Sequence, residues 1–217
     1  MKKIISLFQR DYDGDARAYD EVVPGAEWVI AGEGVATRKY DGTCCRWHAG
    51  QLWKRYDRKV TKQARRRGPP FDPTDCKAPP EAWVAAEESP NLHTGHWPGW
   101  MPIGDGPEDR WHWEALSHLD DLLPLVEGQT YELVGPKIQG NPEHVYRHVL
   151  LPHGAYILAE EGIDPPRDYA GLREWLSLYV VEGIVWHHPD GRMVKIKRTD
   201  FGLPWPCGGT PKAAEAT

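Results

Sequence analysis

Alternating apolar and polar positions in the first half of the chain predict several strands. Residues 27–38 are mostly apolar with interspersed glycines, which favours one or two strands. Residues 43–47 and 52–56 flank a short segment that contains Gly50, and this pattern predicts a β-hairpin. The basic run 59–67 has helical character and is followed by a Gly-Pro-Pro sequence, which predicts a helix that ends there.

Hydrophobic periodicity is lost between residues 69 and 110, where prolines, glycines and acidic residues are frequent. We interpret this segment as an insertion held in place by its tryptophans, with a short helix over residues 80–88. Beyond it, residues 111–116 predict a strand, and residues 119–126 fit either a strand or a helix.

The second half of the chain has the clearer pattern, with four predicted strands and one helix. Residues 168–178 carry apolar side chains at helical spacing. Asp190-Gly191 lies between the last two predicted strands, and an Asp-Gly pair favours a two-residue hairpin turn. The four predicted strands span residues 129–134, 154–159, 182–187 and 193–197.

Length and composition are typical of one globular domain. The chain has 217 residues, of which 40% are hydrophobic and 27% charged, so we expect a single domain over residues 1–206 and a flexible tail over residues 207–217. The net charge of −6 does not indicate a nucleic-acid binder. Residues 54–67 are strongly basic, however, and an average charge does not exclude a basic groove.

The sequence contains no apolar run long enough to span a membrane, and its N-terminal apolar run is too short for a signal peptide. Cys44, Cys45, Cys76 and Cys207 form no Cys-x-x-Cys pair, which argues against a zinc ribbon. We therefore expect reduced thiols in a cytoplasmic protein. No obligate protein partner is evident, and we expect a monomer.

The candidate nucleophile is Lys39, within the sequence Lys39-Tyr40-Asp41-Gly42. A lysine amine becomes nucleophilic when desolvation or nearby positive charge lowers its pKa. Lys-x-Asp-Gly occurs by chance, and a charged edge strand running into a turn would also produce it. Four later segments favour chemistry, because each places a polar or aromatic residue within an apolar strand. Those residues are Glu132, Tyr156, Glu182 and the pair Lys195 and Lys197, a set explained most simply by a bound polyanion with a metal ion.

In this order, the segments resemble the motifs of the covalent nucleotidyltransferase superfamily of ATP-dependent DNA ligases, RNA ligases and mRNA-capping enzymes. Longer stretches narrow the resemblance to the small 5′-to-3′ RNA ligase family typified by vertebrate RNA ligase 1. Those stretches are residues 39–45, 56–59, 62–64, 98–100, 140–142, 152–155 and 182–187. The resemblance extends from about residue 35 to residue 206.

The resemblance implies an α+β adenylyltransferase (nucleotidyltransferase) domain with two packed antiparallel sheets, flanking helices and the nucleotide in the groove between the sheets. Only about 20 residues follow Lys197, so we expect no C-terminal oligonucleotide-binding (OB) barrel. The implied activity is ATP-dependent RNA ligation, with a role in RNA repair. Lys39 would attack the α-phosphate of ATP, AMP would pass to an RNA 5′-phosphate, and an RNA 3′-hydroxyl would then displace AMP.

The resemblance also implies roles for individual residues in the transfer of AMP. Lys195 and Lys197 would hold the α-phosphate and help to lower the pKa of Lys39. Asp41 would orient Lys39 or receive the 3′-hydroxyl, and Glu182 completes the catalytic set.

A second group of residues would bind the cofactors, ATP as covalent AMP and Mg²⁺ or Mn²⁺. Glu182, with Glu132, would hold the metal ion. Glu132 would also contact the ribose hydroxyls, Tyr156 would stack on adenine, and Arg55 resembles an arginine that contacts ribose or phosphate. Arg38 stands where some RNA ligases have a glutamate that contacts the base, so ATP over GTP rests on the family resemblance alone.

The basic run beside the first motif is a candidate RNA-binding surface, since it could follow a phosphate backbone. A solvated helix face is the ordinary alternative for such a run. The residues concerned are Arg58, Lys59, Lys62, Arg65, Arg66 and Arg67.

Other readings of the sequence are less specific. His93-x-x-His96 and His187-His188 lack cysteine partners, and such histidines are more often surface or turn residues than metal ligands. The absence of a Gly-x-x-x-x-Gly-Lys-Ser/Thr sequence excludes a P-loop. A DNA ligase, a capping guanylyltransferase and, outside the enzymes, a catalytically inactive module that binds RNA ends remain open.

Overall fold

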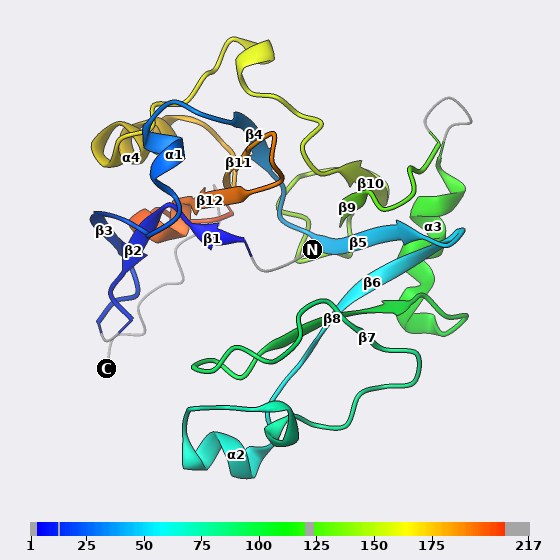
Figure 1. Ribbon diagram of the computed structural model, residues 1–217. Helices are drawn as coiled ribbons and strands as arrows, with labels where there is room; N and C mark the ends of the chain where they lie inside the picture. Colours follow the sequence, from blue (N-terminus) through cyan, green and yellow to red (C-terminus); the bar gives the residue numbers. More distant parts are fainter. Residues whose placement is uncertain (1–3, 13, 120–123, 207–217) are drawn as a thin grey trace, which may run out of the picture. The chain divides into compact units, whose positions relative to one another are not determined.

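The computed structural model describes residues 4–12, 14–119 and 124–206 (Figure 1). These residues form a mixed α+β structure whose contacts divide it into two compact units. The six-stranded unit comprises residues 42–153, and the four-stranded unit comprises residues 4–41 and 154–206. The predicted tail over residues 207–217, and part of the ambiguous segment 119–126, lie outside the described residues.

The sheet of the six-stranded unit is antiparallel throughout and is built on the predicted hairpin. Ala49 and Gly50 both have positive φ, at 51° and 74°, which suits the tight turn of a two-residue hairpin. The strand order is β10-β9-β5-β6-β8-β7. The strands are β5 (Thr43–His48), β6 (Gln51–Arg58), β7 (Val84–Ala85), β8 (Trp97–Pro102), β9 (Thr130–Val134) and β10 (Val149–Pro152).

The predicted strand over residues 111–116 is wrong, because helix α3 (Arg110–Ser117) occupies this segment. Its inward-facing residues are His112, Ala115 and, partly, Leu116, which follow the i, i+3, i+4 spacing of a helix. Trp111 and Trp113 lie on other faces of the helix. Their alternation with His112 in the sequence is what resembled a strand. Ala115 packs with Cys45, Leu52, Leu133 and Leu150, the core of this unit.

The insertion over residues 69–110 contributes to the sheet. The predicted helix over residues 80–88 is wrong, because β7 pairs with β8 there and the Trp83 indole donates to the Tyr56 carbonyl at 3.0 Å. β8, which the sequence pattern did not predict, pairs along β6. The predicted basic helix is confirmed as α2 (Lys62–Arg67), which the Thr61 hydroxyl caps. Two 3₁₀ turns, η1 (Pro73–Asp75) and η2 (Pro107–Asp109), follow it along the chain.

The sheet of the four-stranded unit has the order β1-β12-β11-β4. β11 (Gly183–His187) and β12 (Met193–Lys197) confirm the predicted hairpin, and β4 (Val35–Lys39) pairs antiparallel with β11. β1 (Ile5–Ser6) runs parallel to β12, so this sheet is mixed and the expectation of two antiparallel sheets is wrong for it. The backbone groups at the outer edge of β12 need hydrogen-bond partners, and the N-terminal segment supplies them. No pattern in the sequence reveals whether that segment runs parallel or antiparallel to β12.

Short elements surround this second sheet in the same unit. α4 (Tyr169–Leu178) confirms the predicted helix: the Asp168 carboxylate caps it, and Leu172, Trp175 and Leu176 are buried. These side chains pack with Ile184, Trp186 and Ile196 of the sheet to form the core. The remaining elements are β2 (Phe8–Arg10), β3 (Ala18–Val22), α1 (Glu27–Ile30), η3 (Ala159–Glu161) and η4 (Arg198–Phe201).

One prediction in this unit is only partly correct, and another is wrong. The segment 27–38 holds α1 before β4, because Trp28 and Val29 are both buried and the chain then turns through Gly32 and Gly34. The segment 154–159 is not a strand: a single isolated bridge joins it to β4 before η3 begins.

Within the described residues, no helix is both long enough and apolar enough to cross a membrane.

Candidate functional site

The ends of three neighbouring strands bring Lys39, Glu182 and Lys197 together in the four-stranded unit. Gly183 of β11 lies opposite Lys39 of β4 on one side and Lys197 of β12 on the other. A Cβ atom on Gly183 would lie 2.1 Å from the carbonyl oxygen of Ile196, so only glycine fits between these strands. The register therefore places Glu182, immediately before β11, beside both lysines.

The Glu182 carboxylate forms an ion pair with each lysine. Its Oε2 atom lies 2.5 Å from Lys39 Nζ, and its Oε1 atom lies 2.7 Å from Lys197 Nζ. The Glu182 side chain is 5% exposed, whereas those of Lys39 and Lys197 are 19% and 30% exposed. One buried carboxylate thus holds two cations whose amines remain partly open to solvent.

Lys195 adds a third cation to this cluster. It lies two residues before Lys197 on β12, which places both side chains on the same face of the strand. Burial, together with the positive charges of Lys197 and Lys39, lowers the pKa of Lys195 to about 8. The three lysines and one glutamate leave an excess of positive charge, which suits an anionic ligand.

Asp41 lies beside the same cluster. Burial raises the pKa of its carboxyl, and so does the negative charge of Glu182, while a hydrogen bond from the Trp205 indole opposes the shift. The Trp205 Nε1 atom donates to Asp41 Oδ2 at 2.8 Å. The carboxylate is therefore oriented by an indole.

Tyr156 is tied to β4 through the backbone and lies near Tyr40. The Arg38 N–H donates to the Tyr156 carbonyl at 3.0 Å, and the two tyrosine rings meet edge to face with centroids 6.5 Å apart. The Arg38 guanidinium lies 5.1 Å from the centroid of the Tyr40 ring. Arg38 therefore contacts an aromatic side chain of the first motif.

The six-stranded unit holds the other predicted nucleotide-binding residues. Glu132 of β9 accepts a hydrogen bond from the Gly42 N–H at 3.0 Å through Oε1, and its Oε2 atom lies 2.8 Å from His153 Nε2. Arg55 of β6 pairs with Asp57 at 2.7 Å and lies over the Trp100 ring. Glu132 is buried, so these hydrogen bonds offset the cost of removing its carboxyl group from water.

Comparison with known proteins gives a consistent result. A family model described as RNA ligase 1 matches residues 116–214. RNA ligase 1 of Rattus norvegicus is 34% identical over 226 aligned positions, covering 81% of this chain and 70% of the relative. RNA ligase 1 of Danio rerio is 32% identical over 231 positions, covering 81% of this chain and 69% of the relative. The chain belongs to the RNA ligase 1 family. The family resemblance predicted from the motifs is thus confirmed.

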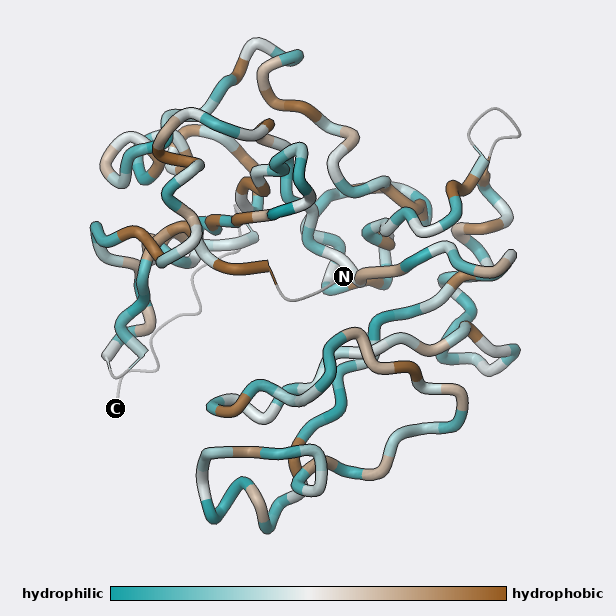
Figure 2. Tube along the Cα trace, in the orientation of Figure 1, coloured by the Kyte–Doolittle hydropathy of each residue, from teal (hydrophilic) through white to brown (hydrophobic). Residues whose placement is uncertain are grey.

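In this member of the RNA ligase 1 family, the side chains of the basic run are of two kinds: those held by contacts within the protein and those exposed to solvent. Arg58 is buried, donates twice to the Lys77 carbonyl, and lies 4.5 Å from the centroid of the Trp97 ring. Arg67 pairs with Asp75 at 2.6 Å. The exposed members are Lys59, Lys62, Arg65, Arg66 and Arg67, on or beside α2, which is mainly hydrophilic (Figure 2).

Reasoning from the sequence missed several side chains that support the lysine cluster. The Asp200 carboxylate accepts a hydrogen bond from the Lys197 N–H at 2.9 Å and pairs with Arg10 at 2.6 Å. Burial raises the pKa of Asp200. Neither residue belongs to a recognised motif, whereas His153, missed in the other unit, stands within the matched stretch 152–155.

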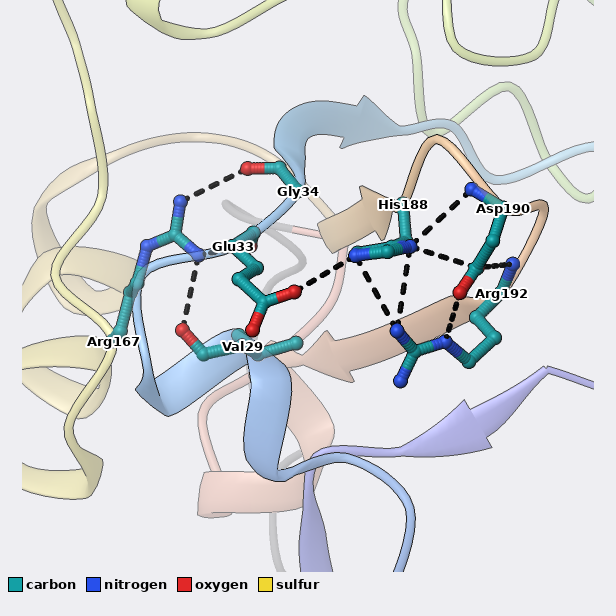
Figure 3. A network of polar contacts seen from close by, with 7 residues as sticks. All are labelled: Val29, Glu33, Gly34, Arg167, His188, Asp190 and Arg192. Carbon is teal, nitrogen blue, oxygen red and sulfur yellow. Dashed lines mark hydrogen bonds and ion pairs between the residues drawn. The ribbon is translucent and has the colours of Figure 1, made fainter.

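His188, the second residue of the histidine pair 187–188, takes part in a polar network at the opposite end of β11 (Figure 3). His188 lies 2.8 Å from Glu33 Oε2 and 2.8 Å from Asp190 Oδ1, and Arg192 pairs with Asp190 at 2.7 Å. Arg167 donates to backbone carbonyls of the segment that leads into β4, including that of Gly34 at 3.0 Å. These contacts connect the β11–β12 turn to the start of β4, so His188 has a structural role here.

Proposed function

We propose that this protein is an ATP-dependent RNA ligase that joins RNA 5′-phosphate and 3′-hydroxyl ends through a covalent lysyl-AMP on Lys39. Membership of the RNA ligase 1 family supports RNA ligation. The observation that supports the nucleophile is the Glu182 carboxylate, which holds both Lys39 and Lys197 beside the desolvated Lys195. This arrangement combines an amine, a proton acceptor and two further cations.

The first step would form a bond between Lys39 Nζ and the α-phosphorus of ATP and break the bond to pyrophosphate. The amine must lose a proton before it attacks. Glu182 Oε2, at 2.5 Å, is within reach to accept that proton. Lys195 and Lys197 would bind the α-phosphate oxygens and stabilise the negative charge that develops on them.

The same lysines would act when AMP passes to RNA. The RNA 5′-phosphate would displace Lys39 from the AMP phosphorus, and the 3′-hydroxyl would then displace AMP. Asp41, oriented by Trp205, would orient Lys39 or receive the proton of the 3′-hydroxyl. Its raised pKa favours the second role, because a less acidic carboxyl is a better proton acceptor.

The carboxylates of the lysine cluster fit a magnesium or manganese ion. Mg²⁺ prefers oxygen ligands, and Glu182 and Asp41 supply carboxylate oxygens in the four-stranded unit. Glu132 is the second residue that the family resemblance assigns to the metal. A bound ion would supply charge neutralisation for the phosphates of ATP.

We propose that Glu132 contacts the ribose hydroxyls, Tyr156 stacks on adenine, and Arg55 contacts ribose or phosphate. Arg38 stands where some RNA ligases have a glutamate that contacts the base, and its guanidinium lies over the Tyr40 ring. The preference for ATP over GTP therefore rests on the family resemblance alone. The six-stranded antiparallel sheet and the mixed four-stranded sheet support an adenylyltransferase domain over residues 1–206.

RNA would be held in part by the exposed cations of the basic run. Lys59, Lys62, Arg65 and Arg66 are exposed, and Arg67 shares its charge with Asp75. Such side chains bind the phosphate backbone without reading sequence. Arg58 would act indirectly, because its guanidinium is buried against Trp83 and Trp97.

The decisive experiment is intact mass after incubation with ATP and Mg²⁺. We expect the wild type to gain the mass of one AMP, Lys39→Ala to gain none, and Lys59→Ala, an exposed lysine, to behave as wild type. GTP in place of ATP tests base preference. Nicked RNA and nicked DNA then separate an RNA ligase from a DNA ligase. A folded wild type that gains no AMP would show that the proposal is wrong and would favour an inactive RNA-end-binding module.

A further inference from the structure

Three neighbouring strands of the six-stranded unit place a thiol, a carboxylate and an imidazole on one face of the sheet. Cys44 of β5 lies directly opposite Glu132 of β9, and Glu132 lies opposite Leu151 of β10. The His153 N–H donates to the Thr130 carbonyl at 3.0 Å, which extends the pairing beyond β10. His153 is two residues from Leu151 and therefore points to the same face as Cys44 and Glu132.

One potential ligand atom from each of Cys44, Glu132 and His153 lies within 4.8 Å of the other two. The geometry is fixed by outer contacts. His153 Nδ1 lies 2.9 Å from the Thr130 hydroxyl, which orients the ring so that Nε2 faces Glu132. The second Glu132 oxygen accepts from the Gly42 N–H at 3.0 Å. Hydrogen bonds of this kind behind metal ligands orient them and preserve their geometry.

We propose that Cys44, Glu132 and His153 form a binding site for Zn²⁺. A thiolate, an imidazole and a carboxylate suit Zn²⁺, whereas Mg²⁺ prefers oxygen ligands alone. Zn²⁺ binding would displace two protons: that of the Cys44 thiol to solvent, and that shared by His153 Nε2 and Glu132 Oε2, which would pass to solvent or to His153 Nδ1, where the Thr130 hydroxyl oxygen accepts it. The three protein ligands leave a fourth position for water or an anion.

The distances between the ligand atoms are close to those that Zn²⁺ needs. Tetrahedral zinc with these ligands requires separations of about 3.4–3.6 Å between ligand atoms. His153 Nε2 and Glu132 Oε2, now 2.8 Å apart, would move apart by less than about 1 Å as the ion replaces their hydrogen bond. Cys44 would approach by no more than about 1.4 Å through side-chain rotation, since all three ligand atoms lie within 4.8 Å of one another. The His153 side chain is 23% exposed, so an ion can reach the site.

Cys45 provides an internal comparison. It follows Cys44 on the same strand and therefore points to the opposite face. Its side chain is fully buried in the core with Leu52 and Leu133, and its thiol donates to the Thr43 carbonyl. A zinc site built from the Cys44 face should not depend on Cys45.

Zinc at this position would affect the ligase through Glu132. This consequence rests on the proposed function, in which Glu132 contacts the ribose of ATP. A carboxylate that coordinates Zn²⁺ is less available to accept hydrogen bonds from ribose hydroxyls. Zinc and nucleotide would therefore compete, and adenylylation of Lys39 would slow as Zn²⁺ is added.

The first test measures zinc binding by the full chain, by equilibrium dialysis with metal analysis and without nucleotide. We expect one Zn²⁺ per wild-type chain, an affinity at least tenfold lower for Cys44→Ala and for His153→Gln, and no change for Cys45→Ala or Cys76→Ala. With Co²⁺ as the probe, the sulfur-to-metal charge-transfer absorption should disappear in Cys44→Ala alone among the cysteine variants. Circular dichroism checks that each variant is folded. The site does not exist if the wild type binds no stoichiometric zinc, or if Cys44→Ala binds it as tightly as the wild type.

The second test measures AMP transfer to Lys39 with Mg²⁺ and increasing Zn²⁺. Each variant is compared with itself without zinc. Zinc should slow the wild type and Cys45→Ala at least tenfold more than Cys44→Ala. If zinc slows all variants equally, the proposed competition between zinc and nucleotide at Glu132 is wrong. The dialysis experiment still decides separately whether the zinc site exists. A wild type that forms no lysyl-AMP even without zinc would instead contradict the proposed function, and dialysis again decides the zinc site separately.

Discussion

Replacing Lys195 with methionine is expected to abolish nucleotide transfer while making the folded protein more stable at neutral pH. Burial and neighbouring cations lower the pKa of Lys195 from its ordinary 10.5 to about 8. Folding therefore disfavours the charged form of this side chain. Methionine keeps most of the apolar length of the side chain and removes the charge.

The size of the stabilisation follows from the pKa difference. One pKa unit corresponds to about 1.4 kcal/mol, so a fall from 10.5 to about 8 corresponds to about 3.5 kcal/mol at most. The side chain is only partly buried, and solvent screening reduces this figure, so we expect about 1–2 kcal/mol at pH 7. Between pH 8 and pH 10.5 the unfolded wild type binds more protons at Lys195 than the folded protein, so wild-type stability rises with pH there. The advantage of the variant should disappear over the same window.

Urea denaturation at pH 7 and at pH 10 measures this effect, and intact mass after incubation with ATP measures nucleotide transfer. Lys59→Met, at an exposed lysine, serves as the control and should change stability by less than about 0.5 kcal/mol at either pH. The reasoning is refuted if Lys195→Met is less stable than the wild type at pH 7. A stability difference that stays the same at pH 10 would also refute it.

Three further substitutions test other parts of the structure. Glu182→Gln leaves two cations without their shared carboxylate, so lysyl-AMP formation, followed by intact mass over time, should slow at least about 100-fold. Gly183→Ala would push a Cβ atom against β12 and should lower the free energy of unfolding in urea by about 2 kcal/mol, whereas Gly104→Ala meets only an ordinary contact at 3.9 Å and should change it much less. Changing Arg65 and Arg66 together to alanine should weaken RNA binding and reduce its logarithmic salt dependence by about 2.

Controls and contrary results distinguish these effects from general damage. Arg173→Ala, at an exposed arginine of the four-stranded unit, should leave the salt dependence of RNA binding unchanged. An unchanged salt dependence after loss of Arg65 and Arg66 would rule out the basic run as an RNA-binding surface. Full lysyl-AMP formation by Glu182→Gln would exclude this carboxylate as the proton acceptor. Equal stability of the two glycine variants would contradict the close approach of β11 and β12.

The amino-acid sequence by itself determined the elements whose signals are local. The hairpins of β5–β6 and β11–β12 follow from alternation around short turns, and α4 follows from helical spacing and the Asp168 cap. The order and content of the motifs also sufficed to identify the RNA ligase 1 family. These features needed no knowledge of which strands pair over long distances.

Only the tertiary structure decided how the motif residues meet. Glu182 reaches Lys39, 143 positions earlier, because β11 pairs with both β4 and β12 in one particular register. Long-range pairing also determined that β8 joins the sheet and that Cys44, Glu132 and His153 share a face. The physical reason is that periodicity records which side of an element is buried, whereas the partner that buries it lies elsewhere in the chain.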